Sequence, residues 1–184
     1  AWTWEHMALS RARVVFSDGG LGDRIHGVIS DALNASRDKQ KLVDDVWDMR
    51  GRIEKDRQAK SVWDLKLAVG GVIDLEFIVQ FAQLAYGDQL AVPQAPPQTV
   101  FTRLAETGLL PEALELKEIH AEFTAVLQLM SACLNEPLKV ESWSEGFKEL
   151  LIRVTHFPSL DALETDLKDK KQRVRALMEQ FIVV

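Results

Sequence analysis

The sequence has a single cysteine, Cys133, which excludes an internal disulfide and is typical of a reducing compartment. No apolar run approaches the ~20 residues that a membrane-spanning helix needs, and no signal-peptide pattern opens the chain. An excess of positive charge is also lacking, because the formal net charge is -6, which argues against a general nucleic-acid surface. These features predict a cytoplasmic protein that binds neither membrane nor nucleic acid.

Residues typical of metal and nucleophile sites are equally sparse. The four histidines are scattered without metal-ligand spacing (His6, His26, His120 and His156). No serine sits in a nucleophile motif, and Cys133 falls inside a predicted helix. We therefore predict no metal ligand and no catalytic residue in this chain.

What the chain does contain is helical periodicity. Its 184 residues, 47% of them apolar, suffice for one domain with a substantial core. Strand-like alternation is scarce, so we predict an all-α fold, a bundle of about eight helices. The expected helices cover residues 2–15, 21–33, 37–60, 71–86, 99–107, 112–134, 141–154 and 160–181. Three prolines make residues 87–98 a loop.

The predicted helix over residues 71–86 is apolar on nearly every side. One face carries apolar residues at helical spacing (Ile73, Phe77, Phe81 and Leu84), and others lie on the remaining faces (Leu75, Ile78, Val79 and Ala82). Such a helix belongs in the middle of a bundle. Its two acids and its amide then need polar partners, because buried polar groups are normally paired (Asp74, Glu76 and Gln80).

Arginines are the natural partners of these acids. We expect a structural polar network that includes Glu5, Arg11, Arg13, Asp74, Glu76 and Gln80, with Arg50 as a further partner. Binding of a substrate by these arginines is the alternative. A magnesium site on Asp74 and Glu76 is disfavoured, because two residues apart on a helix places them about 200° apart.

Lys66, Gly70 and Gly71 precede the central helix. Glycines let a backbone approach a ligand closely, and a helix start offers N–H groups and a positive dipole end. With the charge of Lys66, this end is expected to hold a phosphate or an acidic side chain of a partner. The alternative is that the glycine pair only makes a turn.

Three motifs resemble those of glutamine synthetase adenylyltransferases, the adenylylating and deadenylylating enzymes of bacterial nitrogen control. Residues 66–80 are similar to the pattern K-x-x-x-G-G-x-x-D-x-E-F-x-x-Q, and residues 4–13 are similar to W-E-x-x-A-L-x-R-A-R. Met49 and Arg50 resemble the family's M-R helix. The motifs occur in the family's order over residues 1–86, whereas residues 99–184 match only as variable helical sequence.

The resemblance implies that residues 1–184 are one helical domain of a longer enzyme, following its second nucleotidyltransferase domain. That enzyme transfers AMP from ATP to a tyrosine of glutamine synthetase and removes it by phosphorolysis, with Mg²⁺ and ATP as cofactors. The implied partners are the preceding domain, glutamine synthetase and the PII signal protein. Lys66, Gly70, Gly71 and Arg50 are the expected nucleotide or cleft-facing residues, and the fragment alone is expected to be inactive. Two alternatives stay open: a helical interaction module that never touches nucleotide, and the equivalent domain of a uridylyltransferase relative.

Overall fold

The structure, a computed structural model, describes residues 2–57 and 61–183. Within these ranges it contains nine α-helices, one 3₁₀ helix and no strand, which confirms the all-α prediction. The elements are α1 (Thr3–Leu9), α2 (Leu21–Asn34), α3 (Lys39–Asp56), α4 (Val72–Ala85), α5 (Gly87–Leu90), α6 (Pro97–Glu106), α7 (Ala113–Cys133), η1 (Val140–Ser142), α8 (Glu145–Thr155) and α9 (Leu160–Phe181).

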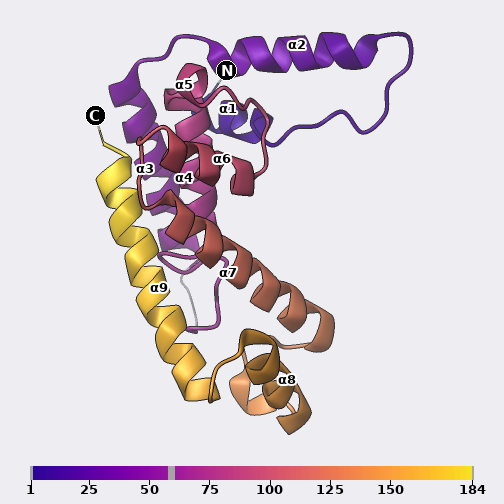
Figure 1. Ribbon diagram of the computed structural model, residues 1–184, viewed down its shortest axis with the longest axis vertical. Helices are drawn as coiled ribbons and strands as arrows, with labels where there is room; N and C mark the ends of the chain where they lie inside the picture. Colours follow the sequence, from indigo (N-terminus) through magenta and orange to yellow (C-terminus); the bar gives the residue numbers. More distant parts are fainter. Residues whose placement is uncertain (1, 58–60, 184) are drawn as a thin grey trace.

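Helix α4 is the centre of the bundle, as its apolar sequence predicts. It packs against α1, α3, α6, α7 and α9, and the ribbon shows it enclosed by these helices (Figure 1). Leu75, Ile78 and Phe81 are completely inaccessible to solvent. Apolar burial of this extent stabilises the fold by about 2 kcal/mol per large side chain. The central helix therefore provides a rigid support for the polar side chains that it carries.

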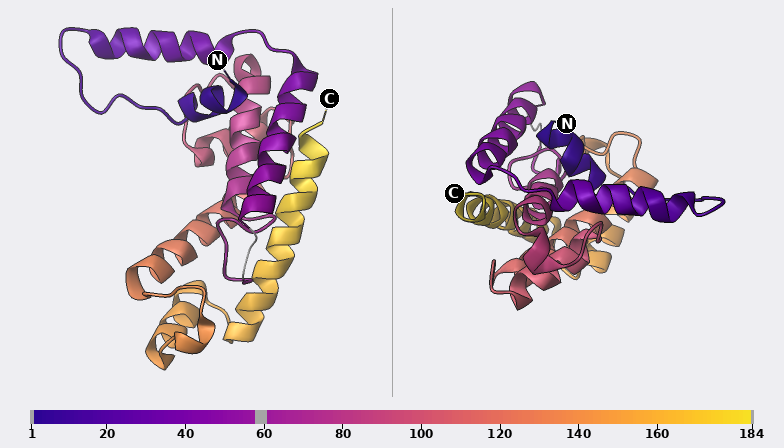
Figure 2. Two further views of the ribbon diagram at one scale, coloured as in Figure 1. Left: turned by 180° about the vertical axis from the view of Figure 1, so that it is seen from behind. Right: turned by 90° about the horizontal axis from the view of Figure 1, so that it is seen from above.

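The molecule is elongated, and α7 and α9 diverge from α4 toward one end. Helix α8 lies between the far ends of α7 and α9 (Figures 1 and 2). Ser144 caps its start by accepting a hydrogen bond from the Phe147 amide. At the opposite end α2 projects from the bundle. No helix in the described ranges is long and apolar enough to cross a membrane.

The first helix is shorter than predicted. Residues 2–15 were expected to be helical, but α1 ends at Leu9. The Ser10 hydroxyl donates to the Met7 carbonyl, a local bond that competes with the helical pattern. Farther along, the Ala12 carbonyl accepts a hydrogen bond from the Gln94 side chain at 2.6 Å. This tertiary contact holds residues 11–13 in an irregular course across the bundle.

Candidate functional site

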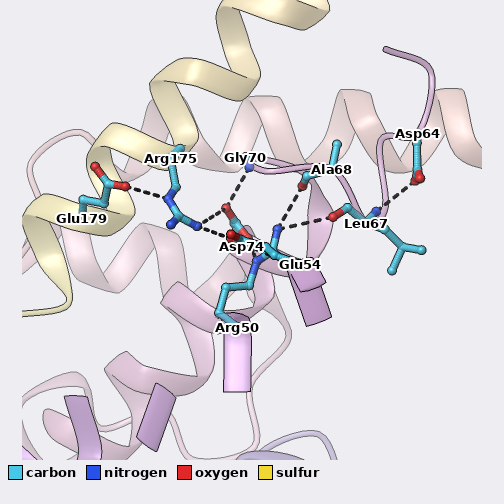
Figure 3. Close-up of polar contacts among 9 residues, drawn as sticks. All are labelled: Arg50, Glu54, Asp64, Leu67, Ala68, Gly70, Asp74, Arg175 and Glu179. Carbon is cyan, nitrogen blue, oxygen red and sulfur yellow. Dashed lines mark hydrogen bonds and ion pairs between the residues drawn. The ribbon is translucent and has the colours of Figure 1, made fainter. Parts of the chain in front are cut away.

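A charged pair lies at the start of α4. Arg50 of α3 and Asp74 of α4 are both fully buried, and Arg50 Nε donates to Asp74 Oδ1 (Figure 3). Arg50 Nη2 also donates to the carbonyls of Leu67 and Ala68, at 3.3 and 3.2 Å. A buried ion pair is tolerated only when hydrogen bonds replace its lost hydration. Arg50 thus fixes the loop before α4 and lies inside the fold rather than on a cleft.

Helix α9 contributes a second arginine to this cluster. Arg175 Nη1 lies 2.7 Å from Glu54 Oε1 and 3.6 Å from Asp74 Oδ2 (Figure 3). The Arg175 guanidinium also stacks over the Trp47 ring. Burial alone would lower the pKa of Arg175, but the hydrogen bond that it donates to Glu179 and the charges of Glu54 and Asp74 raise the pKa. The group stays charged and joins α3, α4 and α9.

The glycine pair lies in the same buried region. The Gly70 amide donates to Asp74 Oδ2 at 2.7 Å, and a Cβ at Gly70 would collide with the Lys171 carbonyl. The amides of Gly71, Val72 and Ile73 donate to the carbonyls of residues 68, 65 and 66, respectively. The N–H groups that we expected to be available to a ligand are therefore used within the fold.

A groove of about 1100 Å³ opens beside this cluster. We call it the basic groove. Its polar lining consists chiefly of Arg11 and Arg13 after α1, Lys66 before α4, Glu76 in α4, and His120, Thr124 and Gln128 in α7. Thus two of the three sequence motifs, separated by more than fifty residues, meet in one surface feature.

Charge in the basic groove is predominantly positive. Arg11 Nη1 lies 3.1 Å from Glu76 Oε2, and both side chains are partly exposed. Lys66 and Arg13 are exposed. The groove therefore contains three cationic side chains against one carboxylate among its described lining residues, in a chain whose net charge is negative.

The two acids of the central motif point to different surroundings. Asp74 pairs with Arg50 in the interior, whereas Glu76 pairs with Arg11 at the groove. Within the described residues, no group of three or more His, Cys, Asp or Glu side chains is placed to hold a metal ion. Asp74 and Glu76 thus do not converge on a common point where both could bind one Mg²⁺ ion.

Helix α7 forms one wall of the groove. His120, Thr124 and Gln128 follow each other at four-residue spacing, which places them on one helical face. Burial lowers the pKa of His120, and its Nδ1 lies 3.1 Å from Gln98 Nε2. His120 is thus neutral near pH 7 and adds a polar rather than a charged group to the wall.

Other expected residues serve local structure. Glu5 accepts a hydrogen bond from the Trp2 amide at 2.6 Å and thereby caps α1, while Gln80 is buried in α4. Sequence reasoning missed Glu54, Arg175 and Gln94. Arg175 belongs to a lysine- and arginine-rich stretch where no pattern distinguishes it, and Gln94 lies in a proline-rich loop with a positive φ of 56°.

A family model described as GlnD PII-uridylyltransferase matches residues 45–182, most of the chain, so the protein belongs to this family of helical domains. Curated relatives carry the more specific name bifunctional glutamine synthetase adenylyltransferase/adenylyl-removing enzyme. The relative from Brucella suis biovar 1 is 39% identical over 99% of this chain. Those from Bradyrhizobium diazoefficiens and Mesorhizobium japonicum are 34% and 39% identical over 99% and 95% of the chain.

The resemblance that the sequence motifs carry is thereby confirmed. The chain spans about a fifth of the length of these relatives, since the aligned region is 19% of the Brucella and Bradyrhizobium proteins and 18% of the Mesorhizobium protein. It therefore corresponds to one region of such an enzyme.

Proposed function

We propose that this chain is the helical accessory domain of a glutamine synthetase adenylyltransferase. In the intact cytoplasmic enzyme it supports ATP-dependent transfer of AMP to a tyrosine of glutamine synthetase and its phosphorolytic removal. ATP and Mg²⁺ bind in the preceding nucleotidyltransferase domain, and PII signal protein is a regulatory partner. The proposal for the intact enzyme rests on the relatives' names and on the resemblance.

The observation that carries the accessory role is the basic groove. Arg11 comes from one motif and Lys66 and Glu76 come from another, yet all three line one open surface, while the buried cluster at Asp74 holds that surface in place. Positioning of two reactants contributes strongly to the rate of a transfer reaction, even without a catalytic side chain. The domain acts by holding reactants, and the chemistry takes place on the neighbouring domain.

The test uses the full-length enzyme that contains this chain and labelled ATP. Full-length protein is expected to incorporate AMP into glutamine synthetase, whereas the isolated 184-residue chain incorporates none. A full-length variant from which residues 1–184 are deleted is expected to lose most of the transfer rate. Transfer at the full rate by the deleted variant would refute the accessory role.

The runner-up function is an interaction module that binds a regulator or the target and never approaches nucleotide. The exposed apolar side chains Val15, Phe16 and Val28 on and before α2 favour it, since a partner that covered them would remove apolar surface from water. It predicts that the isolated chain binds glutamine synthetase or PII protein, and that the deletion affects regulation by PII without changing the basal transfer rate.

A further inference from the structure

We propose that the basic groove binds an extended acidic segment of the partner protein, and that in the adenylyltransferase this partner is the glutamine synthetase subunit. The inference rests on the proposed function and adds to it the surface that contacts the protein substrate. Three observations carry it: the charge of the groove, its size and openness, and the engagement of the neighbouring amides inside the fold.

The charge of the groove selects an anionic occupant. Arg13 and Lys66 are exposed lining residues of the groove, one after α1 and one before α4, and within the described ranges Arg11 has one ion-pair partner, Glu76. The chain as a whole carries a net charge of -6, so the local excess of positive charge in the groove is opposite in sign to the net charge of the chain. Complementary charge guides association and fixes the register of a partner.

The form of the groove favours a peptide segment over a nucleotide. Its volume of about 1100 Å³ exceeds the ~300–1,000 Å³ of typical small-ligand pockets. A phosphate site at a helix start needs backbone amides that are free to donate, but the amides of residues 70–73 already donate hydrogen bonds to oxygen atoms within the fold. Among its described lining residues, the groove offers no Phe, Tyr or Trp on which a base could stack.

The wall formed by α7 suits a peptide backbone. Gln128 and Ser131 are exposed on the groove face of this helix, and Thr124 is partly exposed. Amide and hydroxyl groups can both donate to and accept from peptide groups. Carboxylates of the partner would then pair with Arg13 and Lys66, while its main chain lies along α7.

The experiment measures binding and kinetics separately in the full-length enzyme. The test variant combines Arg13→Glu with Lys66→Glu, and a milder variant combines Arg13→Gln with Lys66→Gln in case the reversals hinder folding. A matched control reverses two exposed arginines outside the groove, Arg52→Glu with Arg153→Glu. Readouts are the dissociation constant for immobilised glutamine synthetase and the KM values for glutamine synthetase and for ATP.

The groove variants are expected to raise the dissociation constant and the KM for glutamine synthetase by about tenfold, because attraction at two sites becomes repulsion. The KM for ATP stays at the wild-type value, and the control behaves as wild type. Added NaCl should weaken wild-type binding more than binding by the variants, since exposed charges are screened by salt.

Three results overturn the inference while leaving the accessory role intact. Unchanged binding of glutamine synthetase by both groove variants excludes the groove as its contact. A raised KM for ATP with unchanged protein binding assigns the groove to the nucleotide. Failure of the proposed function would give a different result, an undiminished transfer rate after deletion of residues 1–184.

The control variant tests for an effect of net charge alone. If it weakens binding of glutamine synthetase as much as the groove variants do, the loss of binding follows from net charge, and the groove is not the contact surface.

Discussion

At the scale of single residues, the two acids of the central motif have unequal surroundings. Asp74 is inaccessible to solvent beside Arg50, whereas the Glu76 side chain is 31% exposed beside Arg11. The sequence shows only that both acids lie on an apolar helix and need arginine partners. Which acid lies inside depends on how α3 and α9 approach α4, and no local pattern encodes that approach.

The first prediction compares these acids. Asp74→Ala should lower the free energy of unfolding by about 3–5 kcal/mol, because it leaves Arg50 buried and unpaired. Glu76→Ala should cost less than about 1 kcal/mol, as expected for an exposed pair. Urea unfolding followed by circular dichroism measures both values. Similar losses for the two variants would contradict the assignment of Asp74 to the interior.

The second prediction concerns two glycines with the same backbone conformation. Gly70 and Gly108 have φ values of 76° and 73°, but a Cβ at Gly108 meets nothing within 4 Å, whereas at Gly70 it collides with the Lys171 carbonyl. Gly108→Ala should cost about 1–2 kcal/mol, the cost of a left-handed alanine. Gly70→Ala should cost at least about 2 kcal/mol more, because α9 must move. Equal melting temperatures of the two variants would show that α9 does not press on Gly70.

At the scale of helices, periodicity predicts most of the fold. The C-terminal helix was expected over residues 160–181 and is found at Leu160–Phe181, where buried apolar residues repeat at helical spacing with one exception, Lys171. The predicted helix over residues 141–154 is divided, because η1 ends at Ser142 and Ser144 caps the start of α8. The predicted helix over residues 37–60 begins at Lys39 after the Asp38 cap; residues 58–60 lie outside the described ranges. Boundaries were missed where a side chain forms a cap or a tertiary bond.

The sequence identified several residues that line the groove, but it did not predict that they would lie together in one groove. Motif spacing singled out Arg11, Lys66 and Glu76, but the groove that they share requires α7, whose contributing residues carry no recognisable signature. Similarly, Gln94 holds Ala12 in place from a distance of 82 residues along the chain. Contacts of this kind are set by tertiary packing rather than by local preference.

The third prediction concerns α2, which exposes much of its apolar surface. Val28 is 68% exposed, while its neighbour Ile29 is only 6% exposed against the bundle. Val28→Ser should change the free energy of unfolding by less than about 0.5 kcal/mol, because the side chain is exposed. Ile29→Ser should instead destabilise the fold by about 2–4 kcal/mol, because it removes core contacts. Urea unfolding measures both values, and a large stability loss for Val28→Ser would refute the exposed placement.

At the scale of the whole molecule, the bundle is divided between two ends. Helix α8 packs against α7 and α9 at the end opposite to α2, and α4 packs against helices nearer the other end (Figure 1). The basic groove and the buried cluster are both built on α4. The site is thus supported by the part of the molecule in which the central helix is enclosed.

The fourth prediction follows from this division. Leu151→Ala in α8 removes a fully buried side chain and should increase amide hydrogen exchange in α8 and in the adjoining ends of α7 and α9. Amides of α3 and α4 should keep their protection. Leu75→Ala in α4 serves as the comparison and should accelerate exchange in all of the surrounding helices. Loss of protection in α4 after Leu151→Ala would mean that the two ends unfold as one unit.

The position of Arg175 has a consequence for the order of events during synthesis. Arg50 and Asp74 are made long before Arg175, which reaches Glu54 and Asp74 from the last helix, and the Trp47 indole donates to the Ile182 carbonyl at 3.1 Å. While the C-terminal helix is still inside the ribosome, the earlier helices lack both the cover and the countercharge that it brings. The nascent domain therefore remains an incomplete intermediate until α9 has left the ribosome, and its uncovered apolar surface is a target for chaperones during that interval.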